Sequence, residues 1–163
     1  MNELRELADA FLKACLRHGI LAATAESCTG GMIIAAMTDI PGSSSVVDRG
    51  FISYSNEAKM EMLGVSKATL DTHGAVSRET ALEMATGALQ HSNAGISLAV
   101  TGIAGPDGGS PEKPVGLVWF GLARRGQTAI AESQVFQNNG RDFIRRETVR
   151  AALQMGLGEL GRG

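Results

Sequence analysis

The sequence predicts an α/β protein, a three-layer α/β/α sandwich with a mixed, mostly parallel sheet and a C-terminal hairpin. Helical patterns separate most of the early strand-like runs, as parallel strands require. Two later runs, 115–123 and 128–136, are separated by only a short polar stretch, which favours a hairpin. The 163 residues, 44% of them apolar and 20% charged, fit one folded domain spanning 1–163.

The N-terminal part of the chain predicts a helix, a strand and a second helix. Residues 3–18 carry apolar side chains at helical spacing, and Gly19 follows as a helix C-cap. The apolar run 20–25 is strand-like and leads directly into a turn of small residues at 26–31. A buried helix resumes over 32–37. A strand that turns sharply into a helix brings the turn to the carboxyl edge of a sheet.

The central part predicts one strand followed by three helical segments. After a Pro/Gly/Ser loop at 41–45, apolar and polar residues alternate over 46–54 as in a strand. Residues 56–63 predict a short helix, and 66–71 a helical turn. A longer helix is expected over 77–90, with a serine at its N-cap and an incomplete capping box.

The C-terminal part adds a strand, the hairpin and a last helix. The apolar strand 96–100 leads into a second glycine-rich turn at 101–106, and a Gly/Pro-rich loop follows at 107–114. The last helix is expected over 141–157. No internal repeat or linker divides the chain.

Composition and charge disfavour several classes of protein. The formal net charge is -2 and aromatic residues make up 4%, which disfavours direct binding of nucleic acid or anionic membranes. Cys15 and Cys28 have neither disulfide-framework nor zinc-site spacing, so no metal is expected. There is no signal-peptide pattern, and no apolar run reaches the ~18 residues that would span a bilayer. We expect a cytoplasmic protein that does not bind membranes.

The turn at 26–31 is the strongest candidate for chemistry. Ser27 lies where a strand gives way to a helix, and Gly30 and Gly31 leave room for a ligand. Unpaired amides at a helix start favour negative charge and can stabilise an oxyanion, the logic of a nucleophile elbow. The competing interpretation of Ser27 or Thr29 is a plain helix N-cap.

Cys28 is the competing nucleophile. It would need a base, and none of the three histidines is tied to this turn by spacing, so a small buried cysteine is the simpler interpretation. For the same reason no Ser-His-Asp triad can be assembled.

Tyr54 and Lys59 form a second candidate constellation, a tyrosine at a strand end and a lysine one turn into a helix. Lysine can activate a serine hydroxyl when burial lowers its pKa, and tyrosine can relay or hold the proton. The alternative is a solvated lysine and a half-buried tyrosine.

Two further segments could hold a ligand. The Gly-x-x-Gly turn Thr101–Gly105 can approach a phosphate or ribose through its backbone, although it is not a complete dinucleotide fingerprint. Arg141 and Arg145 lie four apart, share a helix face and could clamp a phosphate. A tight turn and ordinary surface ion pairs are the alternatives.

Together these segments resemble the CinA C-terminal-domain family, whose enzymatic members are nicotinamide-nucleotide amidohydrolases. The resemblance rests on TAESCTGG at 24–31, GFISYSNEAK at 50–59, AVTGIAGPDGGSPEKPVG at 99–116 and RDFIRRETVRAAL at 141–153, and extends over essentially the whole chain. The family usually carries Gly-Asp-Arg before the last helix, where this chain has Asn139-Gly140-Arg141.

The resemblance implies a cofactor-free homodimeric hydrolase that deamidates nicotinamide mononucleotide to nicotinic acid mononucleotide and ammonia. Ser27 matches the family nucleophile, and Tyr54 and Lys59 match the assisting tyrosine and lysine, with the immediate base left open. The residues expected to bind the small-molecule nucleotide are Thr29, Gly30, Gly31, Thr101, Gly102, Ala104, Gly105, Arg141 and Arg145. Arg145 is the simplest match for the arginine of the last helix that is expected near the phosphate. The alternatives are a catalytically silent nucleotide-binding module and a competence-associated interaction module.

Overall fold

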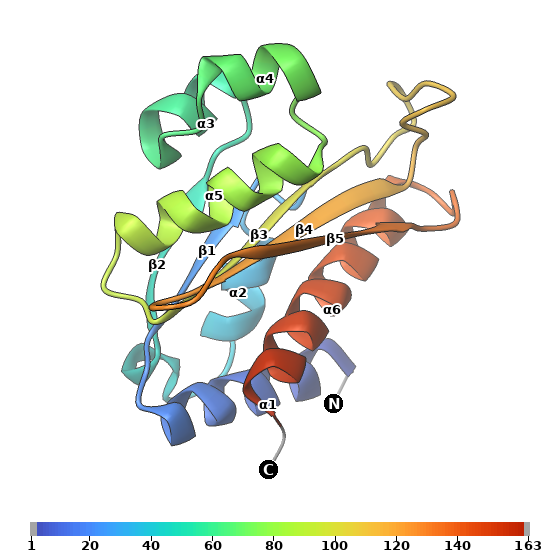
Figure 1. The fold of residues 1–163 in the computed structure, drawn as a ribbon. Coiled ribbons are helices and arrows are strands. Elements are labelled where there is room, and N and C mark those ends of the chain that lie inside the picture. The colour runs from blue at the N-terminus through green and yellow to red at the C-terminus, as the bar shows by residue number, and fades with distance from the viewer. Residues whose placement is uncertain (1–2, 162–163) are drawn as a thin grey trace.

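A five-stranded mixed sheet organises the residues that the computed structural model describes, 3–161 (Figure 1). The strands are β1 (Ala22–Glu26), β2 (Val47–Ile52), β3 (Ile96–Gly102), β4 (Leu117–Arg124) and β5 (Ile130–Val135). Their order in the sheet is β2-β1-β3-β4-β5. β1 pairs in parallel with both β2 and β3, whereas β4 runs antiparallel to β3 and to β5. All strands except β4 therefore point the same way, and β4 and β5 form the predicted hairpin.

Helices cover both faces of this sheet. They are α1 (Glu3–His18), α2 (Met32–Thr38), α3 (Asn56–Leu63), α4 (Lys67–His73), α5 (Arg78–Gln90) and α6 (Arg141–Leu160), with a 3-10 turn η1 at Ser43–Ser45. Figure 1 shows α1, α2 and α6 on one face and α3, α4 and α5 on the other. The three-layer sandwich predicted from the sequence is confirmed.

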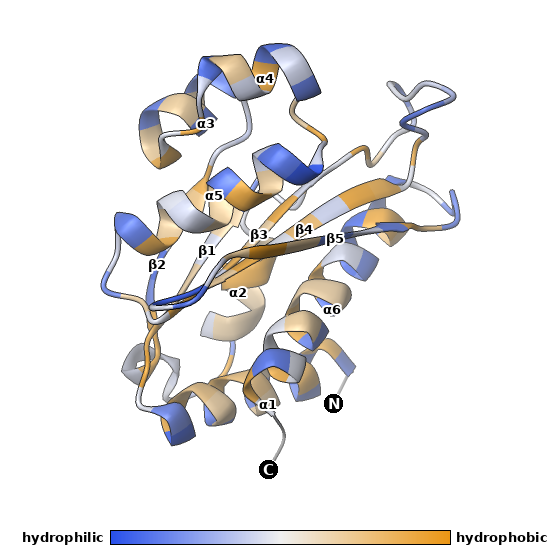
Figure 2. Cartoon of the chain, viewed as in Figure 1, coloured by the Kyte–Doolittle hydropathy of each residue, from blue (hydrophilic) through white to orange (hydrophobic). Residues whose placement is uncertain are grey.

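Two apolar clusters, one on each face, stabilise the layers. The larger cluster joins α1, α2 and α6 to the sheet and includes Phe11, Leu98 and Leu153, all buried. The smaller joins α3, α4 and α5 to the opposite face around Met84 and Leu63. Figure 2 shows hydrophobic colour on the central strands β3 and β4 and on the parts of the helices that meet the sheet, whereas much of the edge strands β2 and β5 is neutral or hydrophilic. Central strands β1 and β3 are buried on both faces, as expected for parallel strands between helix layers.

One glycine lets a helix approach the sheet closely. A Cβ atom at Gly121 of β4 would lie 2.3 Å from the carbonyl oxygen of Ala81 in α5. Any larger residue at this position would push α5 away from the sheet. No helix within residues 3–161 is long and apolar enough to cross a membrane.

Several element boundaries differ from the sequence expectations for tertiary reasons. β2 ends at Ile52 rather than 54, because its partner β1 ends opposite it at Glu26 and then turns away. β3 extends to Gly102, where antiparallel pairing with Val118 of β4 continues the ladder. α6 continues to Leu160, whose side chain is buried in the larger cluster.

Candidate active site

The carboxyl ends of β1, β2 and β3 lie at one edge of the sheet, and a cavity of about 270 Å³ opens there. Its walls come from the segments that follow these strands, together with α3, the 75–76 segment and the first residue of α6. Ligands bind at this edge of open α/β sheets because loops and helix starts converge there. The cavity is close to the lower end, roughly 300 Å³, of the usual range for small-molecule pockets.

Ser27 is fixed at the floor of this cavity by the turn that follows β1. Its amide donates to the carbonyl oxygen of Val100 in β3 at 3.1 Å, so the turn stays attached to the sheet. Gly30 and Gly31 have φ angles of 58° and 105°, which are strained for any residue with a side chain. The serine is 8% exposed, and its side chain meets Lys59.

Lys59 is buried, only 1% exposed, beside the Ser27 hydroxyl. Its Nζ lies 3.0 Å from Ser27 Oγ, 3.0 Å from the carbonyl oxygen of Ser53 and 3.1 Å from that of Tyr54. Burial lowers the pKa of this amine, and the neighbouring Cys28 opposes that shift more weakly. No carboxylate pairs with Lys59 in the described part of the chain, so no opposite charge offsets the cost of burying the protonated amine.

The neighbours of Lys59 define the orientation of its amine. Carbonyl oxygens only accept hydrogen bonds, so two N–H groups of the amine satisfy those of Ser53 and Tyr54. The third position of the nitrogen faces Ser27 Oγ: a charged amine donates to this oxygen, whereas a neutral amine can accept from the serine hydroxyl through its lone pair. This arrangement can take a proton from a serine during nucleophilic attack.

Tyr54 lies at the mouth of the cavity, with 61% of the residue exposed. Its phenolic oxygen accepts from Arg141 Nη2 at 3.2 Å, and among residues 3–161 it makes no hydrogen bond to Ser27 or Lys59. The geometry therefore favours Lys59 over Tyr54 as the base.

The two arginines of α6 serve different segments. Arg141 Nη1 donates to the carbonyl oxygen of Gly105 at 2.8 Å and lines the cavity. Arg145 donates to the carbonyl oxygens of Cys28 and Thr29, at 3.0 and 3.2 Å, and braces the serine turn from outside the lining. The two arginines share a helix face, as expected, but Arg141 lines the cavity whereas Arg145, one turn later, supports the serine turn.

Comparison with known proteins places this architecture. The family model described as the CinA C-terminal domain matches residues 4–160. The chain belongs to this family. It is 47% identical over 153 residues to the nicotinamide-nucleotide amidohydrolase PncC of Escherichia coli (strain K12), over 94% of this chain and 92% of that protein. A putative competence-damage inducible protein of Acetivibrio thermocellus is 52% identical over 94% of this chain but 37% of its own length. The solved structure of competence/damage inducible protein CihA from Agrobacterium tumefaciens has a TM-score of 0.94 and 51% identity, over 98% of this chain and 96% of that one.

The CinA-type fold gathers most of the predicted site residues in one cavity. Those in its lining are Ser27, Tyr54, Lys59, Thr101, Gly102, Ala104, Gly105 and Arg141. Thr29, Gly30, Gly31 and Arg145 lie outside the lining. Thr29 is buried and donates its hydroxyl to Glu26, and the Gly30 amide donates to the Ser27 carbonyl oxygen. These four residues act on the turn itself in this structure.

Glu26 organises the serine turn of this CinA-family chain, a role that the sequence did not predict for it. Its buried carboxylate accepts from Thr24 Oγ1 at 3.0 Å and Thr29 Oγ1 at 2.6 Å, and from the amides of Ile33 and Ile34, both at 2.9 Å. It replaces an N-cap side chain for α2, whose N-cap Gly31 has none. The sequence signal for this role is an acidic residue at the end of an apolar strand, because a buried carboxylate needs hydrogen-bond donors around it.

The lining also includes Asn56, Ala75, Val76, Ile103 and Asp107. Ile103 lies in the Thr101–Gly105 turn, Asp107 in the loop after it, and Asn56 between Tyr54 and Lys59, but none was predicted as a site residue. Ala75 and Val76 fall in no segment to which the sequence assigned chemistry. Only the folded chain brings them to the serine.

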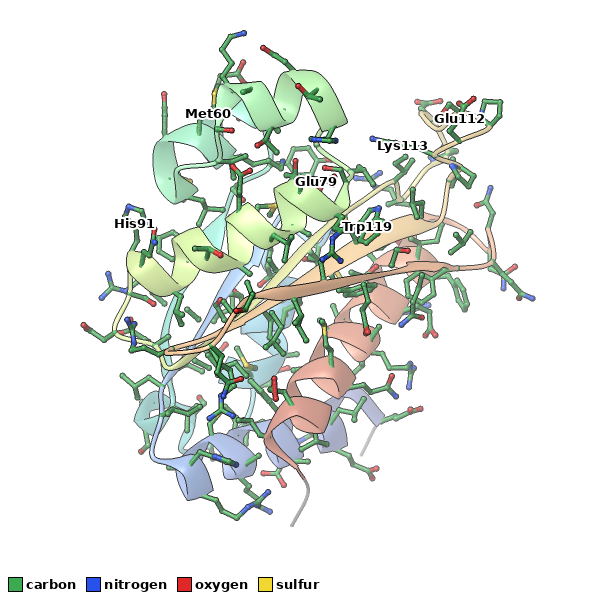
Figure 3. All side chains as sticks on the ribbon, viewed as in Figure 1. Met60, Glu79, His91, Glu112, Lys113 and Trp119 are labelled. Atoms are coloured by element: carbon green, nitrogen blue, oxygen red, sulfur yellow. The ribbon has the colours of Figure 1, made fainter. Side chains whose placement is uncertain are left out.

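The remaining nucleophile and base candidates lie elsewhere or are inert. Burial raises the pKa of the Cys28 thiol to about 12, which keeps it protonated at neutral pH. The rings of His18 and His91 bond backbone carbonyl oxygens, and His73 contacts Glu79. Figure 3 shows His91 at the C-terminal end of α5, away from the loop that carries Glu112 and Lys113. Within the described residues no cluster of His, Cys, Asp and Glu could hold a metal ion.

Proposed function

We propose that this chain is an amidohydrolase that converts nicotinamide mononucleotide and water into nicotinic acid mononucleotide and ammonia. The observation that carries the chemistry is the buried amine of Lys59 at 3.0 Å from Ser27 Oγ, at the floor of a cavity. The substrate class follows from the 47% identity to a nicotinamide-nucleotide amidohydrolase over nearly the full chain.

In the proposed first step Ser27 Oγ attacks the carboxamide carbon while its proton passes to neutral Lys59. The protonated lysine then donates that proton to the leaving nitrogen, the C–N bond breaks and ammonia departs, leaving an acyl ester on Ser27. A water molecule attacks this ester with Lys59 again as base, and the acid product leaves as Ser27 recovers its proton. The cationic pyridinium ring makes the amide carbon more electrophilic.

The rest of the site is proposed to orient the nucleotide and stabilise the oxyanion. Backbone groups of Thr101–Gly105 approach the ribose, and Arg141 binds the phosphate from the cavity wall. A phosphate contact by Arg145 would require its guanidinium to leave Cys28 and Thr29. For the oxyanion, the Gly30 amide is already bonded to Ser27, which leaves the amides of Thr29 and Gly31 as the expected donors of the turn.

Ser27→Ala tests the nucleophile. Turnover, followed as ammonia release from nicotinamide mononucleotide, should fall by several orders of magnitude, whereas binding measured by calorimetry should persist. Full activity in this variant would remove Ser27 from the mechanism. Binding by the unmodified chain without ammonia release would instead favour the silent nucleotide-binding module, and no binding at all would favour an interaction module.

The proposal includes a cytoplasmic homodimer with a role in pyridine-nucleotide salvage. It rests on family resemblance alone. Sedimentation velocity of the purified chain at catalytic concentrations measures the assembly directly, and a monomer there would contradict it.

A further inference from the structure

The charged side chains of the cavity lining are Lys59, Asp107 and Arg141. Because the amine of Lys59 is already bonded to Ser27, Ser53 and Tyr54, the lining presents one free anion and one cation to a ligand. The Asp107 carboxylate makes no hydrogen bond or ion pair with any residue from 3 to 161. It is exposed and can accept a hydrogen bond from a ligand.

One short segment positions both charges. Asp107 follows two residues after Gly105, and the Gly105 carbonyl oxygen accepts from Arg141. A second donor of Arg141 reaches Tyr54, so the guanidinium is turned toward these two oxygens and forms no ion pair with Asp107. Neighbouring carboxylates and guanidiniums readily pair when geometry allows. Here Asp107 and Arg141 line the same cavity without pairing, so each is available to a ligand group of opposite charge.

The proposed substrate has this charge pattern. It carries a permanently cationic pyridinium ring next to the reacting carboxamide and an anionic phosphate beyond the ribose. The apolar side chains of Ala75, Val76 and Ile103 also line the cavity and can contact a flat ring.

We propose that Asp107 is a specificity-determining residue that attracts the cationic ring of the substrate, while Arg141 takes the phosphate. This inference rests on the proposed function and adds to it the preference for a charged ring. It implies that a nucleotide with the same ribose and phosphate but an uncharged ring binds less well, and that the difference depends on one carboxylate.

The test compares nicotinamide mononucleotide with its reduced form, which has an uncharged dihydropyridine ring. Binding of both is measured by calorimetry at one salt concentration to Ser27→Ala and to Ser27→Ala/Asp107→Asn. Asp107→Asn should weaken the binding of the oxidised nucleotide by about fivefold, the upper range for a partly exposed charge pair. The affinity for the reduced nucleotide should not change. Raising the salt concentration should shrink the difference.

Glu112→Gln in the same background is the matched control. Glu112 lies in the outer part of the same loop, as Figure 3 shows, and outside the cavity lining, so its loss of charge should change neither affinity. Equal weakening of both nucleotides by Asp107→Asn would overturn the inference in favour of a ribose contact. No weakening of either would overturn it outright.

Failure of the proposed function is distinguishable from failure of this inference. If the unmodified chain neither binds the oxidised nucleotide nor releases ammonia from it, the function itself is wrong. If ammonia is released but Asp107→Asn leaves the preference between the two nucleotides unchanged, only the role of Asp107 is wrong.

Discussion

Two glycine-containing turns follow the central parallel strands β1 and β3, and different contacts hold each of them. The turn after β1 is held by the four-fold acceptor Glu26 from within and by Arg145 from α6. The turn after β3 is tied by Thr101 Oγ1 to the carbonyl oxygen of Ala75 and by Arg141 to Gly105, and the Asp107 that follows it pairs with no residue between 3 and 161. The first turn is built to fix one side chain, whereas the second leaves polar groups available to a ligand.

Lys59→Met should have the largest effect on activity of these variants, because it removes the partner of Ser27, the side chain that the first turn positions. Turnover should fall by roughly 10²–10⁴-fold, the usual contribution of a general base, while nucleotide binding persists. The measurement is ammonia release alongside calorimetry. Lys67→Met in α4, whose exposed amine pairs with Asp71, is the matched control and should behave as the parent. Equal losses in both variants would contradict a specific role for Lys59.

Glu26→Gln tests whether the first turn depends on its buried acceptor. A glutamine keeps one acceptor oxygen but turns an N–H₂ toward groups that donate, so buried donors lose their partner. The free energy of unfolding should fall by about 1–3 kcal/mol in urea denaturation. Asp107→Asn in the second turn should change it by less than about 0.5 kcal/mol. Similar values for the two variants would remove the distinction between the turns.

The smallest of these effects is expected from pH, which changes the protonation of Lys59 beside the first turn. Burial lowers the pKa of Lys59 from 10.5, so kcat/KM should rise with pH as the folded enzyme loses this proton, at a pH below 10.5. Between the lowered pKa and 10.5 the unfolded chain binds more protons than the folded one, so the free energy of unfolding also rises with pH. Lys59→Met should abolish this part of the stability profile. Denaturation at several pH values compares it with the parent.

The locally encoded elements were predictable because short-range contacts specify them. α3 and α5 have the expected bounds, since the hydroxyls of Ser55 and Ser77 accept from the amide of the third residue of each helix and Gly64 ends α3 in a left-handed conformation. The strand–turn–helix around Ser27 was predicted from its apolar run and its glycines. Element boundaries that depend on a partner strand, such as the end of β2, could not be predicted from such local patterns.

The order of the elements, the α/β class and the residue types able to carry the chemistry could all be predicted from local patterns in the sequence. Long-range contacts, which those patterns do not encode, bring Lys59 to Ser27 and Tyr54 to Arg141, and they make Arg145 a support for a turn whereas Arg141 lines the cavity. The physical reason is the separation along the chain between the residues that make contact. Periodicity and capping act over one or two helical turns, whereas these contacts join residues 32 to 117 positions apart, and the strand order and register of the sheet set their distances.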